Sequence, residues 1–235
     1  VGKKLDRKEF HYGQYGVDYY RKVLEKAVQF KIGVNFHEPV KDTGERRTYP
    51  NMLTREGARG MEYNAWLGGN PPAHTTILPF TRLLSGPMDY TPGVFQLNNF
   101  RYTQPGSNII DEHAIVPSTI AKELALYVVY YSPMQMAADL PKHYTKHPEA
   151  FKFIKNVPVN WEKKKIINGE IGEYLTIARK DIKSGDWFIG SITNEKERNF
   201  SKHTIRNYRI DLMSFSKFLY QVDQNLSIIK IDRSF

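Results

Sequence analysis

Apolar side chains recur at helical spacing in two stretches of the chain. The first stretch, residues 16–31, places them along one helical face, and so does the second, residues 118–131, where Ser118 or Thr119 is placed to cap the start. A short β-branched and aromatic run, residues 32–37, directly follows the first stretch and is typical of a buried strand in a parallel α/β unit. The pattern predicts helix–strand alternation in this part of the chain.

Two later segments, residues 60–63 and 86–90, are predicted to be short strands with polar ends, separated by loops that contain Pro and Gly. From about residue 156 the pattern changes to alternating strands joined by tight turns. These strand-like runs are residues 165–170, 173–178 and 186–193. We therefore expect an α/β part over residues 1–155 and a separate antiparallel β domain over residues 156–235.

Composition excludes several classes of site. The 235 residues include no cysteine, so disulfides, thiolate metal sites and cysteine nucleophiles are absent. No run approaches the roughly 20 apolar residues of a membrane-spanning helix, so no membrane partner is expected. The net charge of +9 would suit nucleic acid if the basic residues were clustered. They are spread along the chain, and the densest run, residues 163–165, lies beside a predicted turn, so no nucleic-acid partner is expected.

Three glutamates fall within 25 residues: Glu38, Glu56 and Glu62. Glycoside hydrolysis needs two carboxyl groups, one to protonate the leaving oxygen and one to activate water or attack the sugar. In a chain with 25 acidic residues, such spacing also arises among surface carboxylates. Glu38 follows one predicted strand and Glu62 ends another, which is where barrel enzymes place catalytic residues. Asp89 also ends a predicted strand and either reaches this site or fixes the adjoining turn.

These glutamates lie in segments that resemble glycoside hydrolase family 97, whose best-known members are α-glucosidases. The resemblance covers roughly residues 10–195. It is carried by Val34-Asn35-Phe36-His37-Glu38-Pro39, by residues 43–51, by Arg55-Glu56-Gly57-Ala58-Arg59-Gly60-Met61-Glu62-Tyr63-Asn64, and by residues 74–82, 86–93, 132–141 and 168–174.

The resemblance implies a fold and a set of site residues. The fold is α/β: the C-terminal part of a (β/α)8 TIM barrel, followed by an antiparallel β-sandwich-like domain. Glu62 corresponds to the general acid and Glu38 to the general base of the inverting subgroup. Glu38, Glu56 and Glu62 match positions that bind calcium, a cation that takes roughly six to eight oxygen ligands. His37 is expected either to bind a sugar hydroxyl or to be a satisfied histidine in the barrel wall.

The implied activity is calcium-dependent hydrolysis of terminal α-glucosidic bonds in oligosaccharides, in the periplasm or beyond the cell. The family's N-terminal β-sandwich and the first part of the barrel are expected as missing partners, so this chain alone is predicted to be inactive. Residues 11–20 resemble the inverting members. A retaining α-galactosidase of the same family and a non-catalytic carbohydrate-binding or interaction fragment stay open. Residues 201–235 depart from the family's strand pattern.

Overall fold

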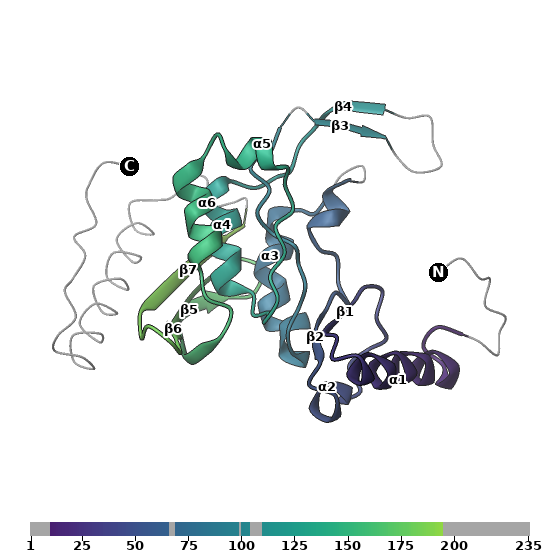
Figure 1. Ribbon diagram of the computed structural model, residues 1–235. Helices are drawn as coiled ribbons and strands as arrows, with labels where there is room; N and C mark the ends of the chain where they lie inside the picture. The colour runs from purple at the N-terminus through teal and green to yellow at the C-terminus, as the bar shows by residue number, and fades with distance from the viewer. Residues whose placement is uncertain (1–9, 66–68, 99, 104–109, 195–235) are drawn as a thin grey trace.

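The computed structural model describes residues 10–65, 69–98, 100–103 and 110–194. In Figure 1, α1, β1 and β2 lie on one side of the molecule and the sheet β5–β7 lies on the other, with α3 and α4 between them. The described chain is mixed α/β, with a short parallel strand pair near its start and a three-stranded antiparallel sheet near its end.

The first predicted helix is confirmed as α1, Gln14–Gln29. Its buried side includes Leu24 and Ala27. The helix ends where Lys31 takes a left-handed conformation with φ 57° and the Ile32 amide donates to the Ala27 carbonyl at 2.9 Å. Such a turn satisfies carbonyls that the last helical turn would leave without donors.

The predicted strand after α1 is confirmed as β1, Val34–Phe36. It pairs in parallel with β2, Met52–Arg55, through partners such as Asn35 and Thr54. The hydrophobic pattern did not predict β2, because this four-residue strand is short and flanked by polar residues. A parallel pair needs a crossover, and here the crossover contains only the single helical turn α2, Glu45–Thr48.

The two strands predicted at residues 60–63 and 86–90 are wrong. The first is a 3-10 helix, Met61–Ala65, which begins where Gly60 passes so near Tyr90 that an added Cβ would lie 3.0 Å from the Tyr90 carbonyl oxygen. The second segment has no strand assignment. Pro87 has no amide hydrogen to donate to a ladder, and Gly86 has a φ of 119°, outside the β region.

The middle of the chain consists of short helices and a hairpin. Their bounds are α3 Pro72–Ile77, two 3-10 helices at Leu78–Phe80 and Arg82–Ser85, β3 Phe100–Thr103, β4 Ile110–Ala114, α5 Pro141–Tyr144 and α6 Pro148–Asn156. The antiparallel hairpin β3–β4 projects from the body at the top of Figure 1.

The second predicted helix is confirmed as α4, Ile120–Val129. Of the two candidate caps, Thr119 holds the position, because its side chain accepts a hydrogen bond from the Lys122 amide at 3.1 Å. Leu126 and Val128 on this helix are completely buried.

The three predicted C-terminal strands are confirmed as β5 Trp161–Glu170, β6 Tyr174–Asp181 and β7 Trp187–Thr193. They form one antiparallel sheet in the order β5-β6-β7. Among the described residues this sheet packs on α4 and has no second sheet facing it as a sandwich would. The predicted extension of this domain to residue 235 lies outside the described residues.

The main apolar core lies between α4, the sheet and the loops around residues 61–90. Its buried members include Met88, Leu126 and Ile192. A glycine in the middle of β7, Gly190, lets the helix approach closely, since an added Cβ would lie 2.8 Å from the Ala125 carbonyl oxygen. The Arg179 guanidinium on β6 donates to the Val128 carbonyl at 2.6 Å. Core and hydrogen bonds thus join α4 to the sheet.

None of the helices within the described ranges has the length and apolar character that crossing a membrane requires.

Candidate active site

The carboxyl ends of β1 and β2 bring three of the predicted site residues to one edge. His37 and Glu38 directly follow β1, and Glu56 directly follows β2. The Glu56 amide donates to the Phe36 carbonyl at 2.8 Å, which extends the parallel ladder past the assigned strands. Because parallel strands end at the same edge, their first loop residues lie close together.

His37, Glu56 and Glu62 form a cluster whose potential ligand atoms all lie within 4.8 Å of one another. His37 Nδ1 lies 3.8 Å from Glu56 Oε2. Glu62 reaches the cluster from the 3-10 helix Met61–Ala65 rather than from a strand end. A donor group from each of three separate segments therefore converges on one point, and a cluster of this composition can bind a cation or exchange a proton with a ligand.

Glu38 is not a member of this cluster, although its main chain is bound to it. The Glu38 amide donates to Glu56 Oε2 at 3.2 Å, and the Tyr20 hydroxyl donates to the Glu38 carbonyl at 2.8 Å. Glu38 takes a left-handed backbone conformation with φ 49°, which is uncommon outside glycine and typical of functional sites. The structure thus brings Glu56, Glu62 and His37 together and leaves the Glu38 side chain out of the cluster, so the predicted set of calcium ligands stays a prediction. The assigned roles of Glu38 as base and Glu62 as acid stay predictions.

The His37 ring is held by a buried carboxylate. Its Nε2 lies 2.9 Å from Asp89 Oδ2, and the Asp89 side chain is only 2% exposed. Partial burial by itself would lower the pKa of His37, but the hydrogen bond to Asp89 and the charges of Glu56, Asp89 and Glu62 outweigh it and raise the pKa above the usual value. The site therefore favours the protonated imidazole more than water does.

Arg82 is a site-supporting residue that the sequence analysis missed. Its guanidinium donates to the Arg55 carbonyl at 2.9 Å, to the Glu56 carbonyl at 2.8 Å and to the Pro87 carbonyl at 3.0 Å. Burial and the charge of Arg55 lower the pKa of Arg82 to about 10, so the guanidinium stays charged at neutral pH. It joins the end of β2 to the segment that carries Asp89. No local pattern marks such a role, because the bonded carbonyls are up to 27 residues distant.

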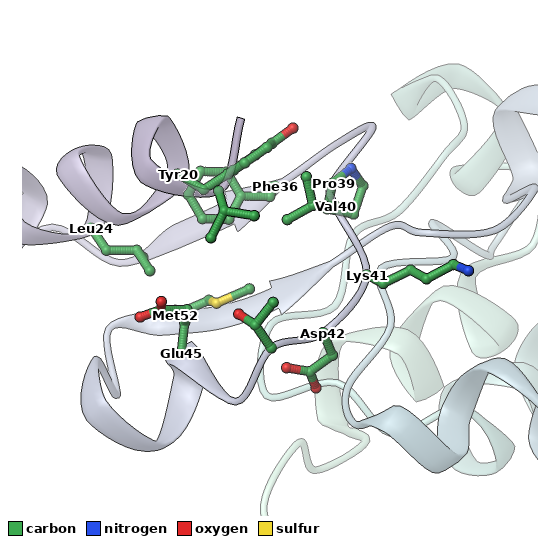
Figure 2. Close-up of a pocket in the computed structure, with 11 residues that line it drawn as sticks. Tyr20, Leu24, Phe36, Pro39, Val40, Lys41, Asp42, Glu45 and Met52 are labelled. Carbon is green, nitrogen blue, oxygen red and sulfur yellow. The ribbon is translucent and has the colours of Figure 1, made fainter. Parts of the chain in front are cut away.

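A separate small hollow lies between α1 and the strand pair. Figure 2 shows Tyr20 and Leu24 of α1, Phe36 of β1 and Met52 of β2 around it. Its wall contains none of the clustered residues, and its two carboxylates are already paired. Those pairs are Asp42 with Arg46 at 3.0 Å and Glu45 with Arg21 at 2.7 Å. The hollow is a small gap between packed elements and is separate from the cluster of His37, Glu56 and Glu62, called the carboxylate cluster below.

Three protein-family models match the chain. Residues 4–58 match the glycoside hydrolase 97 model, and residues 160–205 match the model described as glycosyl-hydrolase 97 C-terminal, oligomerisation. Residues 195–234 match the model of the phage integrase N-terminal SAM-like domain. The third match begins near the point where the sequence departs from the family 97 pattern.

A family 97 enzyme from Pseudoalteromonas sp. strain K8, solved with panose, is 48% identical, with a TM-score of 0.70 over 79% of this chain and 28% of that one. The same enzyme solved with acarbose gives a TM-score of 0.71 over the same shares. Among curated proteins, a retaining alpha-galactosidase from Bacteroides thetaiotaomicron is 34% identical over 185 residues, which are 76% of this chain and 26% of the relative. The chain spans about a quarter of the length of these relatives.

Proposed function

Because the chain belongs to glycoside hydrolase family 97, we propose that it carries the acid–base carboxyl groups of a site that hydrolyses terminal α-glucosidic bonds in oligosaccharides. The observation that supports this proposal is the convergence of His37, Glu56 and Glu62 at the edge where β1 and β2 end. In the proposal these strands belong to the C-terminal part of a (β/α)8 barrel, where active sites lie at the carboxyl ends of strands. The other barrel strands and an N-terminal β-sandwich complete the site, and the enzyme is exported to the periplasm or beyond.

Three residues, Glu62, Glu38 and His37, have a part in the proposed reaction. Glu62, as the carboxylic acid, protonates the glycosidic oxygen as the bond to the sugar breaks. Glu38 accepts a proton from the water that attacks the anomeric carbon. His37 forms a hydrogen bond with a sugar hydroxyl through the ring nitrogen that faces the cluster. The left-handed turn at Glu38 and the bond from its amide to Glu56 hold the base at the edge of the cluster.

The donor set suits the calcium ion of the proposal in part. Glu56 and Glu62 present carboxylates close together, and calcium prefers such oxygen ligands to the nitrogen of His37. We assign them, with Glu38 from the adjacent loop, as the ligands that this chain contributes, and the remaining oxygen ligands come from other parts of the enzyme. A bound calcium ion would supply positive charge near the reacting sugar.

The relatives fall into two groups that favour different sugars. The 48% identical enzyme from Pseudoalteromonas was solved with panose and with acarbose, which supports α-glucosides. The 34% identical relatives from Bacteroides thetaiotaomicron and Streptomyces bingchenggensis are named as retaining and probable retaining alpha-galactosidases, which supports the second candidate. We give preference to the α-glucoside because of the higher identity.

The test uses the longer enzyme that contains this segment, assayed with aryl α-glucoside and aryl α-galactoside, with and without calcium. We expect faster hydrolysis of the α-glucoside, a requirement for calcium, and loss of on the order of 100-fold or more in kcat when Glu62 becomes Gln. The matched control is Glu149→Gln on the exposed first turn of α6, which should leave kcat unchanged. Full activity of Glu62→Gln would refute the assignment of the acid.

The anomer first released, read by proton NMR, separates inversion from retention. The inverting mechanism that we propose releases the β-anomer from an α-glucoside, whereas a retaining enzyme releases the α-anomer. Binding of oligosaccharide without hydrolysis of either substrate would favour the non-catalytic carbohydrate-binding alternative.

A second function is supported by the integrase match at residues 195–234. Because integrases act on DNA, we propose that this segment brings a DNA partner that the overall charge pattern did not predict. The test compares residues 1–235 with residues 1–194 for binding to a DNA duplex at two salt concentrations. We expect binding only by the longer form, weakening as salt rises. Equal binding by both forms, or binding by neither, would contradict the proposal.

A further inference from the structure

Asp89 is a buried carboxylate that connects three polar groups beneath the carboxylate cluster. Its Oδ2 accepts hydrogen bonds from Asn35 Nδ2 at 2.5 Å and from His37 Nε2 at 2.9 Å. Its Oδ1 accepts a hydrogen bond from the Thr91 hydroxyl at 2.9 Å. Two of the three partners stand on β1 or directly after it, more than 50 residues earlier in the chain.

We propose that Asp89 is the positioning residue of this site: it selects the ring tautomer of His37, aims the His37 side chain at the bound sugar and fixes the orientation of the Asn35 amide beside it. The proposal rests on the function proposed above. Asp89 acts through these two neighbours and does not touch the reacting atoms.

The tautomer follows from the chemistry of the acceptor. A carboxylate accepts hydrogen bonds and donates none, so His37 Nε2 must carry the hydrogen that faces Asp89. In neutral His37 the lone pair is then on Nδ1, the atom that lies 3.8 Å from Glu56 Oε2. Without Asp89 either nitrogen could carry the hydrogen, and the ring could turn about its χ2 angle. The carboxylate therefore decides which His37 atom faces the cluster.

The amide of Asn35 is oriented in the same way. Since Asp89 only accepts, Asn35 must turn its Nδ2 toward it, and its carbonyl oxygen points elsewhere. That oxygen is buried and has no hydrogen-bond partner among the described residues. A buried polar atom without a partner is costly, so the hydrogen bond to Asp89 is what holds the Asn35 amide in an orientation that leaves its carbonyl oxygen unsatisfied.

Asp89 can position its neighbours because its own segment is clamped at several points. The Met88 amide donates to the Tyr131 carbonyl at 3.1 Å, and the Asp89 amide donates to the Arg55 carbonyl at 3.0 Å. The Met61 amide donates to the Tyr90 carbonyl at 2.8 Å.

A strained turn two residues later adds to this clamp. Thr91 has a φ of 57°, a conformation that β-branched residues rarely adopt, and it directs the hydroxyl to Asp89. Strain of this kind persists only where the surroundings fix the backbone. Asp89 is thus held through its own backbone, independently of the two side chains that it orients.

The test compares Asp89→Asn, His37→Gln and the double variant in the full-length enzyme. The asparagine side chain is nearly isosteric with aspartate but is uncharged and able to present a donor. We expect Asp89→Asn to lower kcat on the order of 10- to 100-fold, as loss of such supporting hydrogen bonds does at other sites. Combined with His37→Gln, it should cause little further loss, because both substitutions disrupt the same Asp89–His37 pair. The control Asp186→Asn, at an exposed aspartate before β7, should keep full activity.

Nitrogen NMR of the histidine-labelled enzyme tests the proposal apart from catalysis. The wild type should show His37 with hydrogen on Nε2, and Asp89→Asn should shift or broaden that signal, whereas Asp186→Asn should not. An inactive wild type with this signature would count against the proposed hydrolysis but support the role of Asp89. Full activity of Asp89→Asn in an active enzyme, or an unchanged His37 signal, would overturn the positioning role.

Discussion

Two regions of this molecule are stabilised by different means. The site region, around the ends of β1 and β2, is held by directional polar contacts such as those of Arg82 and Asp89. The α4–sheet region, which consists of α4 and β5–β7, is held by buried apolar side chains such as Leu126 and Ile192. Apolar burial is tolerant of direction, whereas hydrogen bonds set orientation. The stability of the fold therefore depends chiefly on the α4–sheet region. The placement of the site's side chains depends chiefly on the site region.

The largest expected loss of stability comes from the α4–sheet region. Leu126 is fully buried in the main core, and Leu126→Ala removes its contacts and leaves a cavity, which typically costs about 2–5 kcal/mol. Urea unfolding followed by circular dichroism measures the change. Leu140→Ala, at a leucine that is 56% exposed, is the matched control and should change the unfolding free energy by less than about 0.5 kcal/mol.

Arg82→Met tests the polar contacts of the site region. The methionine fills similar space, but the carbonyl groups of Arg55, Glu56 and Pro87 lose their shared donor. Leaving buried acceptors without donors costs about 1–3 kcal/mol. We expect the unfolding free energy to fall by that amount and catalysis by the full-length enzyme to fall as well. Arg47→Met, at an exposed arginine in α2, should change neither. Similar effects of both variants would contradict the claim that the hydrogen bonds of Arg82 stabilise the site region.

Glu123 gives the α4–sheet region a pH dependence that is smaller than either effect. Burial raises the pKa of this carboxyl group despite bonds from Ser118, Gly93 and Val94, so the folded state favours the protonated form. The unfolding free energy should therefore fall as pH rises from the ordinary pKa of a glutamate through the raised one. Glu123→Gln should remove this part of the fall. Urea unfolding of both proteins between about pH 4 and pH 8 measures this dependence. An identical change of unfolding free energy with pH in the two proteins would contradict the prediction.

The smallest effect is expected on the outer face of α1. Val28 is 46% exposed there, and threonine has nearly the same shape and a similar helix propensity. Val28→Thr should change the unfolding free energy of this chain by less than about 0.5 kcal/mol. A large loss would show that this face of α1 is covered by residues outside the described ranges.

The sequence predicted the regular elements better than the connections. Helices α1 and α4 and strands β5–β7 carry periodic apolar residues that reflect their burial, and each was found within a few residues of its predicted bounds. Strand β2 was missed because four residues carry too little pattern. The 3-10 helix at Glu62 was predicted as a strand because a close approach between Gly60 and Tyr90 leaves no periodic signal.

The site was predictable in its residue types but less so in its connections. The resemblance to family 97 pointed to Glu56 and Glu62, which the structure brings together, and to His37 beside them. The contact between His37 and Asp89 spans 52 residues, and one strand-end aspartate in the sequence could equally fix a local turn. In the structure Asp89 does both, since it also bonds Thr91. Only the fold decides between such alternatives.

Gly190 has a consequence for engineering. Because β7 has no side chain at this point, the backbone of α4 approaches the sheet to a separation that any Cβ would obstruct, and Arg179 adds a bond to the Val128 carbonyl. The change of pattern near residue 156 is therefore a boundary in the sequence, but the two parts on either side of it stay packed together in the fold. A protease that cleaves near residue 156 should leave the two pieces associated. A sheet grafted in place of β5–β7 would need both Gly190 and Arg179 to pack on α4.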